Sequence, residues 1–132
     1  MTDHRTAVQE ANAIYRRRNT LTTPEKRDEA ILALARHGVF SNANIHDITG
    51  ASIWFIHLLA PKSAKTGGKI NPETLEDIAE IIRQKDRGEL DRTLFERVVD
   101  RGTSVYVLSR LTGYSITSTK RYAGRLKARE VA

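Results

Sequence analysis

Hydrophobic residues recur at helical spacing along most of the chain, and short polar stretches separate the helical segments. Ala30, Ile31 and Leu34, for example, are spaced to form one face of an α-helix. That helix also has a clear start, because Thr23 can cap it and Pro24 suits the first helical position. The pattern predicts helices over residues 7–19, 24–37, 43–49, 52–60, 72–87, 92–101, 104–112 and 115–128.

These segments predict an all-α protein with two small helical domains. The run Val105–Leu108 has strand propensity, but Thr103 and Ser104 before it are typical of a helix start. Residues 62–71 contain two glycines, three lysines and few apolar residues, which is typical of a linker. We therefore expect an N-terminal helix-turn-helix domain over residues 1–62, a linker and connecting helix over 63–90, and a C-terminal helix-turn-helix DNA-binding domain over 91–132.

The most informative segment is Ser109–Gly124, which reads SRLTGYSITSTKRYAG. A predicted helix ends there at Thr112 and Gly113, a short turn follows, and a second helix opens on small hydroxyl residues and becomes basic. Glycine at the turn can adopt the positive φ angle that such a bend often requires. This order of elements is typical of a helix-turn-helix DNA reader.

A related segment, HDITGASIWFIHLLA, lies 63 residues earlier at His46–Ala60. In the shifted alignment Thr49-Gly50 falls on Thr112-Gly113, and Ser52 falls on Ser115. The serine after each turn can cap the second helix. The repeat therefore predicts two helix-turn-helix units with unequal chemistry on one chain.

The charge distribution favours a polyanionic partner for the C-terminal unit. The chain has a net charge of +6. Residues 91–132 hold nine Lys and Arg against four Asp and Glu, whereas residues 1–60 hold seven against six. The basic excess therefore lies on the segment with the clearer motif, as expected for a DNA-binding surface. A generally basic, solvated surface is the alternative explanation.

In the C-terminal unit, small hydroxyl and basic side chains are predicted to face DNA. Lys120 and Arg121 can donate hydrogen bonds to guanine edges, and the hydroxyl residues can reach bases or thymine methyl groups. Arg125, Lys127 and Arg129 lie further along, where they can meet phosphates. A solvated basic C-terminal helix is the alternative. The predicted DNA contacts of this helix are Ser115, Thr117, Ser118, Lys120, Arg121 and Arg125.

The corresponding helix of the first unit is mostly apolar. We expect its core residues to be Ile53, Ile56 and Leu59, with Phe55 as a further candidate, and its outer residues to be Ser52, Trp54, His57 and Leu58. Trp54 can contact thymine methyls or sugars, and His57 can bond a phosphate or a base edge. Packing of Trp54 and Phe55 in the core or between domains remains an open alternative.

Two basic clusters flank these helices. The lysines of the linker can hold backbone phosphates, although a flexible surface linker explains them equally well. The three consecutive arginines near the N-terminus can enter a minor groove or contact phosphates, and a solvated helix end is the alternative. The residues concerned are Lys62, Lys65 and Lys69 in the linker, and Arg16, Arg17 and Arg18 near the N-terminus.

No catalytic, metal or cofactor site can be assembled from the sequence. There is no cysteine, and the four histidines show no metal-ligand spacing. Residues 65–69 (KTGGK) lack the spacing of a Walker phosphate loop. No apolar run is long enough for a membrane span, and no signal peptide is evident. We therefore expect a soluble, cytoplasmic protein that is not an enzyme and needs no cofactor or metal.

The chain resembles the immunity repressors of temperate mycobacteriophages. The resemblance rests on residues 44–78 (NIHDITGASIWFIHLLAPKSAKTGGKINPETLEDI) and 107–125 (VLSRLTGYSITSTKRYAGR), and it covers nearly the whole chain. The helix-turn-helix part is moderately specific, and the linker sequence is the more particular part. The resemblance implies a lysogeny repressor that binds asymmetric operator-like sites and blocks transcription initiation or elongation, as a single chain whose two DNA-contacting parts replace the halves of a dimer.

We therefore expect a sequence-specific repressor that binds double-stranded DNA as a monomer. The inequality of the two recognition helices favours a non-palindromic site. One rival is a protein–protein interaction module of the antitoxin or adaptor type, which would use Trp54 and Phe55 to bind its partner. The other rival is a DNA-binding accessory factor of a recombinase.

Overall fold

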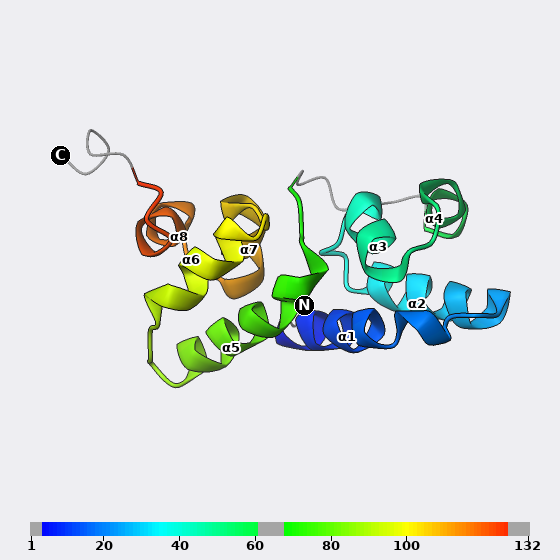
Figure 1. Ribbon diagram of the computed structural model, residues 1–132, viewed down its shortest axis with the longest axis horizontal. Helices are drawn as coiled ribbons and strands as arrows, with labels where there is room; N and C mark the ends of the chain where they lie inside the picture. Colours follow the sequence, from blue (N-terminus) through cyan, green and yellow to red (C-terminus); the bar gives the residue numbers. More distant parts are fainter. Residues whose placement is uncertain (1–3, 61–67, 127–132) are drawn as a thin grey trace.

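The computed structural model describes residues 4–60 and 68–126, and every regular element in these ranges is helical (Figure 1). The prediction of an all-α protein is confirmed. The described elements are α1 (His4–Arg16), the 3₁₀ helix η1 (Arg18–Thr20), α2 (Pro24–Arg36), α3 (Asn42–Thr49), α4 (Ile53–Leu59), the 3₁₀ helix η2 (Pro72–Thr74), α5 (Leu75–Asp86), α6 (Arg92–Asp100), α7 (Val105–Thr112) and α8 (Ile116–Tyr122).

Side-chain caps determine where the helices begin. The Thr23 hydroxyl accepts a hydrogen bond from the Lys26 amide at 3.2 Å, and Pro24 is the first residue of α2. α3 begins with a capping box, in which the side chains of Ser41 and Asn44 each accept from the other residue's backbone amide. Because these bonds are local, the sequence predicted the helix starts to within a few residues.

Two predicted helix ends are wrong. The first helix ends at Arg16 and is followed by η1, instead of running to residue 19. α8 ends at Tyr122 instead of residue 128. Gly124 has a φ angle of 71°, and the Arg125 amide donates to the Lys120 carbonyl at 2.7 Å. This is a Schellman arrangement, which terminates an α-helix in a left-handed residue.

The helices pack as two similar four-helix units. In the first unit α1 contacts α2 and α3, and α4 contacts α2 and α3. In the second unit α5 contacts α6 and α7, and α8 contacts α6 and α7. Figure 1 shows α3 and α4 on the right, α7 and α8 on the left, and α1 and α5 along the lower side. The equivalent helices are therefore α1 and α5, α2 and α6, α3 and α7, and α4 and α8.

α1 and α5 pack against each other in antiparallel directions and join the two units. Arg5 at the start of α1 pairs with Asp86 at the end of α5 at 2.9 Å, and Arg16 at the end of α1 pairs with Glu76 near the start of α5 at 3.2 Å. The buried residues of the two helices belong to one hydrophobic core that runs through both units. They are Ala7, Val8, Ala11 and Ile14 in α1, and Leu75, Ile78, Ala79, Ile81 and Ile82 in α5.

The continuous core bears on the predicted domain organisation. α5 lies in the predicted connecting segment, residues 63–90, yet it packs with α6 and α7 as well as with α1. Burial of apolar surface between the halves stabilises them together. Among the described residues the core is continuous across both units and marks no boundary between them. The predicted domain boundaries therefore stay predictions.

Residues 68–70 connect the starts of α3 and α7, and we call this contact the linker clamp. The Asn44 side-chain amide donates to the Gly68 carbonyl at 3.1 Å, and the Ser104 backbone amide donates to the Lys69 carbonyl at 2.9 Å. A Cβ atom at Gly68 would lie 2.4 Å from Cγ2 of Val107, closer than a side chain allows. The clamp therefore ties both helix-turn-helix units to one short stretch of backbone.

Candidate nucleic-acid interface

The helix-turn-helix units, α3–α4 and α7–α8, have the same turn geometry. Gly50 ends α3 with φ 79° and ψ 0°, and Gly113 ends α7 with φ 84° and ψ 0°. Ser52 and Ser115 then cap the second helices by accepting from the amide three residues further on. The 63-residue repeat in the sequence is therefore also a repeat in the structure.

The two turns are also closed by equivalent hydrogen bonds. His46 Nδ1 lies 2.6 Å from the Ala51 carbonyl oxygen, and the Ser109 hydroxyl donates to the Tyr114 carbonyl at the same distance, 2.6 Å. A buried threonine before each glycine also donates its hydroxyl to the carbonyl four residues earlier. Different side chains therefore close the same turn in the two units.

The same four positions face outward in both second helices, and seven of these eight side chains are exposed whereas Lys120 is half-buried. We call the first set the apolar face of α4 and the second the basic face of α8, because their chemistry differs. The apolar face consists of Ile53, Trp54, His57 and Leu58, and the basic face consists of Ile116, Thr117, Lys120 and Arg121, each 63 residues further on.

The basic face of α8 presents donors on a packed support. Arg121 is exposed and makes no ion pair with the described residues, and Lys120 lies with Nζ 5.9 Å from the centroid of the Tyr106 ring. Beneath them Tyr122 packs edge-on against Phe95, with ring centroids 5.2 Å apart. Of the other predicted contacts, Ser115 and Thr117 are exposed, and Ser118 is half-buried.

The apolar face of α4 exposes large hydrophobic side chains. Trp54 is 66% exposed, Leu58 is 59% exposed and Ile53 is 50% exposed. The prediction that Ile53 lies in the core is therefore wrong, whereas Ile56 is buried as expected. Phe55 packs beneath the Arg27 guanidinium, 4.1 Å from the ring centroid, and thereby rests on α2. The predicted outer residues Ser52 and His57 are also exposed.

Sequence reasoning missed the isoleucine at the start of each second helix. Ile116 is 44% exposed, at the position equivalent to Ile53. The repeat contained the necessary information, because both isoleucines directly follow the capping serine. Ile53 was expected in the core because apolar residues of an amphipathic helix usually face inward, and Ile116 was not among the predicted contacts.

The flanking basic residues lie in different settings. Lys69 is exposed at the linker clamp. Arg125 pairs with Asp100 and also donates to the Ala123 carbonyl, so it is occupied within the chain. The predicted contacts that lie outside the described residues are Lys62, Lys65, Lys127 and Arg129.

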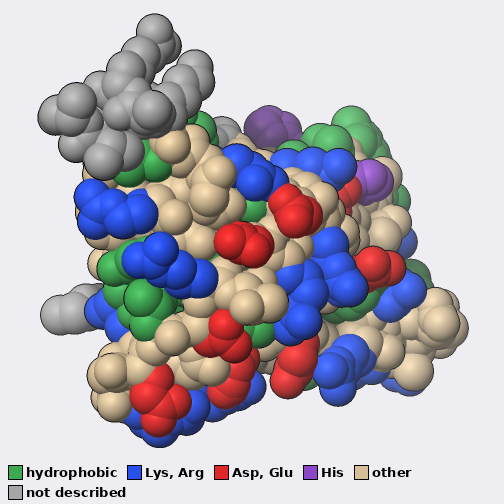
Figure 2. Space-filling view, turned by 60° about the vertical axis from the view of Figure 1, so that its left-hand side comes forward, with side chains coloured by type: hydrophobic (Ala, Val, Ile, Leu, Met, Phe, Trp, Pro, Cys, Tyr) green, Lys and Arg blue, Asp and Glu red, His purple; other side chains and the backbone are tan. Residues whose placement is uncertain are grey.

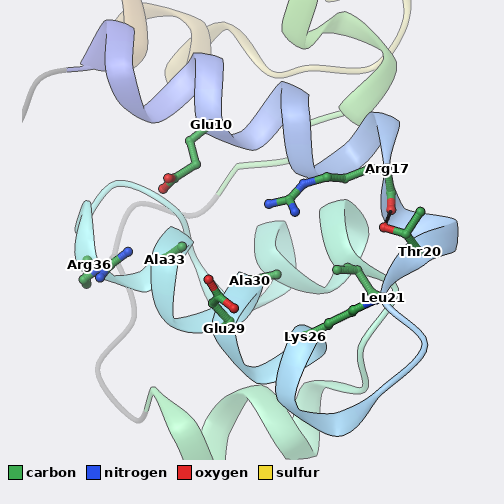
Figure 3. Close-up of a pocket in the computed structure, with 9 residues that line it drawn as sticks. All are labelled: Glu10, Arg17, Thr20, Leu21, Lys26, Glu29, Ala30, Ala33 and Arg36. Atoms are coloured by element: carbon green, nitrogen blue, oxygen red, sulfur yellow. Dashed lines mark hydrogen bonds between the residues drawn. The ribbon is translucent and has the colours of Figure 1, made fainter.

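The three N-terminal arginines make contacts at the end of α1. Arg16 pairs with Glu76 across the antiparallel contact between α1 and α5, which we call the seam between the two units. Arg18 lies over the Tyr15 ring, 4.0 Å from its centroid, and donates to the Tyr15 carbonyl. Arg17 points into a pocket between α1 and α2 (Figure 3). Figure 1 shows α1 on the lower side of the molecule and both α4 and α8 on the upper side.

The pocket beside Arg17 has a volume of about 360 Å³ and a lining of mixed charge. Figure 3 shows Glu10 approaching it from α1, Arg17 from the position directly after α1, and Glu29 and Arg36 from α2. Acidic and basic side chains therefore oppose one another around it. Its lining comes from α1, η1 and α2, and none comes from either second helix.

Charge and hydrophobic surface are unevenly distributed. Figure 2 shows hydrophobic side chains beside histidines along the upper edge, and Lys and Arg interspersed with Asp and Glu over the body below. Arg83, Arg87 and Arg97 each pair with an acidic side chain. The hydrogen bond and charge of Asp77 raise the pKa of Arg97, as expected for a bidentate pair.

Arg110 in α7 is an exception to this pairing. Its three guanidinium nitrogens are buried and have no hydrogen-bond partner among the described residues. Burial lowers the pKa of Arg110, because desolvation disfavours the charged form. The equivalent residue in α3 is Asp47, which is exposed, so the two units differ in charge at this position too.

Comparisons with known proteins gave no match: no family model matches the chain, and neither does any curated protein or solved structure. Among the described helices, none is long and apolar enough to cross a bilayer. Within residues 4–60 and 68–126, no three His, Asp or Glu side chains gather where they could hold a metal ion.

Proposed function

We propose that this protein is a sequence-specific repressor that binds double-stranded DNA with α4 and α8. The observation that carries the proposal is the equivalence of these helices. Each follows a left-handed glycine turn, each is capped by a serine, and each turns the same four positions outward. The second helix of a helix-turn-helix is the element that enters the major groove.

α8 supplies the hydrogen-bond donors for base reading. Arg121 and Lys120 suit guanine, whose O6 and N7 both accept in the major groove, and the Thr117 hydroxyl can donate or accept. Arg121 is exposed and makes no ion pair with the described residues, so it need not break one to reach a base. α8 is therefore the more selective of the two readers in this proposal.

α4 supplies apolar contacts in the same geometry. Thymine presents its C5-methyl group in the major groove, and apolar side chains recognise it by contact. Ile53, Trp54 and Leu58 are exposed at the positions where α8 carries Ile116, Thr117 and Arg121. Contact with thymine methyls would remove this apolar surface from water, which is favourable. His57 adds one polar group to the face.

We further propose that the protein acts as an immunity repressor of a temperate phage on asymmetric operator-like sites. The support is the sequence resemblance together with the two unequal faces on one chain. Because a single chain already carries two readers, one chain per site suffices. Sedimentation of the DNA complex tests this stoichiometry, and two chains per site would contradict the monomeric proposal.

Selection of bound sequences from a random duplex pool tests the function directly. We expect a consensus with two parts, one containing guanine contacts for α8 and one rich in thymine for α4. An Arg121→Ala variant should lose preference only in the first part, and Trp54→Ala only in the second. A failure of the wild-type protein to select any sequence would overturn the proposal.

A protein-binding module is the second candidate, and the exposed Trp54 and Leu58 favour it. Exposed aromatic residues are typical anchors of protein interfaces. This candidate predicts undetectable binding to duplex DNA. Titration of the protein with duplex DNA at low and moderate salt therefore distinguishes the two, since binding to phosphates weakens steeply with salt.

A further inference from the structure

We infer that the single chain reads two half-sites in inverted orientation, on opposite DNA strands, although their sequences differ. The inference rests on the proposed DNA-binding function and adds the arrangement of the site. It follows from how α1 and α5 pack, from the equivalence of the two units and from the contacts that hold the units together.

The antiparallel seam sets the relation between the units. α1 and α5 hold equivalent places in their units, since each contacts the second and third helices of its own unit. The Arg5–Asp86 pair joins the start of α1 to the end of α5, and the Arg16–Glu76 pair joins the end of α1 to the start of α5. Two equivalent helices that pack in opposite directions are exchanged by a two-fold rotation, and no simple translation exchanges them.

The other helices of each unit have corresponding positions relative to the first helix of that unit. α4 contacts α2 and α3 as α8 contacts α6 and α7, so the rotation that exchanges α1 and α5 also brings the second helices approximately onto each other. The match is not exact, because α1 packs against α7 whereas α5 has no equally extensive contact with α3 among the described residues. Figure 1 shows the expected result: α4 and α8 lie at opposite ends of the molecule and on the same side, away from α1 and α5. The chain thus has the approximate symmetry of a helix-turn-helix dimer.

The arrangement is held by contacts that do not depend on DNA. One hydrophobic core passes through both units. In the linker clamp, Asn44 of the first unit bonds the Gly68 carbonyl, and Ser104 of the second bonds the Lys69 carbonyl. The two second helices are therefore presented to DNA as one body with a fixed relative orientation.

The consequence for DNA follows from the symmetry of the duplex. Two readers related by a two-fold axis perpendicular to the duplex meet the two strands in opposite directions, which is why dimeric repressors bind palindromes. Here the exposed residues differ, so each half-site has its own sequence. The site is then an inverted repeat in geometry and asymmetric in sequence.

Making the two faces identical tests the orientation. The triple variant Trp54→Thr, His57→Lys, Leu58→Arg gives α4 the four outward residues of α8, and all three positions are exposed, so the core is untouched. Selection from a random pool should return a palindrome, two copies of the α8 half-site on opposite strands. The variant should bind this palindrome at least about tenfold more tightly than a direct repeat with the same spacing. A single mismatched base pair commonly causes a loss of this size, so tenfold is the smallest difference we expect.

A direct repeat, or a consensus with a single half-site, would overturn the inference. If neither the wild-type protein nor the variant selects any sequence, the proposed function itself fails, which is a separate outcome. Circular dichroism of the variant establishes that it is folded.

A second measurement uses the wild-type faces. The chain has no cysteine, so one cysteine can be labelled uniquely. Ala43→Cys and Tyr106→Cys place it at equivalent exposed positions of α3 and α7. With a DNA-cleaving reagent attached, the two proteins should cut around opposite half-sites, in patterns related by exchange of the strands. Patterns related by a shift along one strand would contradict the inverted arrangement.

Discussion

α4 and α8 have the same geometry and opposite chemistry. Both follow a glycine turn with nearly the same φ angle, and both start from a serine cap. Yet the outward side chains of α4 include an exposed tryptophan and two exposed aliphatic residues, whereas those of α8 are hydroxyl and basic groups apart from Ile116. The comparison teaches that the caps, the turn and the buried positions determine where the outward residues point. The outward residues themselves are then free to differ.

The strongest test of this comparison is loss of a donor from the basic face. Arg121→Ala should weaken binding to the selected site by about 1–3 kcal/mol, the usual value of a bidentate contact to a guanine. Binding to random duplex DNA should change much less, because a base contact carries sequence information. Titration of both DNAs at one salt concentration measures the difference, with Arg101→Ala, at another exposed arginine, as a surface control. Equal losses on the two DNAs would make Arg121 a phosphate contact.

The next test alters the fixed relation between the two faces. Gly68→Ala introduces a Cβ atom 2.4 Å from Val107 Cγ2, so the linker clamp must shift. We expect a loss of unfolding free energy of about 1–3 kcal/mol from overpacking, measured by urea denaturation. The preferred spacing of the two half-sites should also become broader in selection.

The matched control for that test is Glu73→Ala, since Glu73 is an exposed residue close to the linker clamp and is not a predicted DNA contact. It should leave both the stability and the spacing unchanged. Unchanged spacing in the Gly68→Ala protein would show that the clamp does not determine the relation between the faces.

A smaller effect is expected when the methyl groups that α4 is proposed to contact are removed from the DNA. Deoxyuridine in place of thymidine removes only the C5-methyl, and each lost apolar contact should cost about 0.8 kcal/mol. The loss should be confined to the α4 half-site and should disappear in a Trp54→Ala protein. Equal sensitivity of the Trp54→Ala protein would assign the methyl contacts to other residues.

The smallest effect distinguishes the α1–α5 seam from the proposed DNA-binding surface. Arg16 pairs with Glu76 and both side chains are largely exposed. Arg16→Ala should therefore cost at most about 1 kcal/mol of stability and leave the salt dependence of DNA binding unchanged. A fall of about one in the slope of log K against log salt would instead make Arg16 a phosphate contact.

Much of the fold followed from short-range chemistry. The caps at Thr23, Ser41 and Ser104 form within a few residues of the chain, and the two glycine turns need only a residue that tolerates positive φ. The end of α8 was missed because Gly124 was placed inside a longer helix. The antiparallel seam could not be predicted, because it depends on which of several apolar helix faces meet.

The candidate site was predictable in part. The repeat located the second helices, and Trp54 and Arg121 are exposed as expected. Ile53 was misassigned, because an apolar residue on a short helix gives no local indication of whether it faces the core or an external partner. The ion pairs of Arg16 and Arg125 were missed because their acidic partners are distant in sequence.

The continuous core between the two units has a consequence for how the proposed repressor would respond to its own concentration. A repressor assembled from separate subunits loses occupancy steeply on dilution, because its second reader must first be recruited from solution. Here the second reader has a high effective concentration beside the first at any dilution. Occupancy of an operator would then follow the first power of protein concentration, and a twofold change in gene dosage would alter it gradually instead of abruptly.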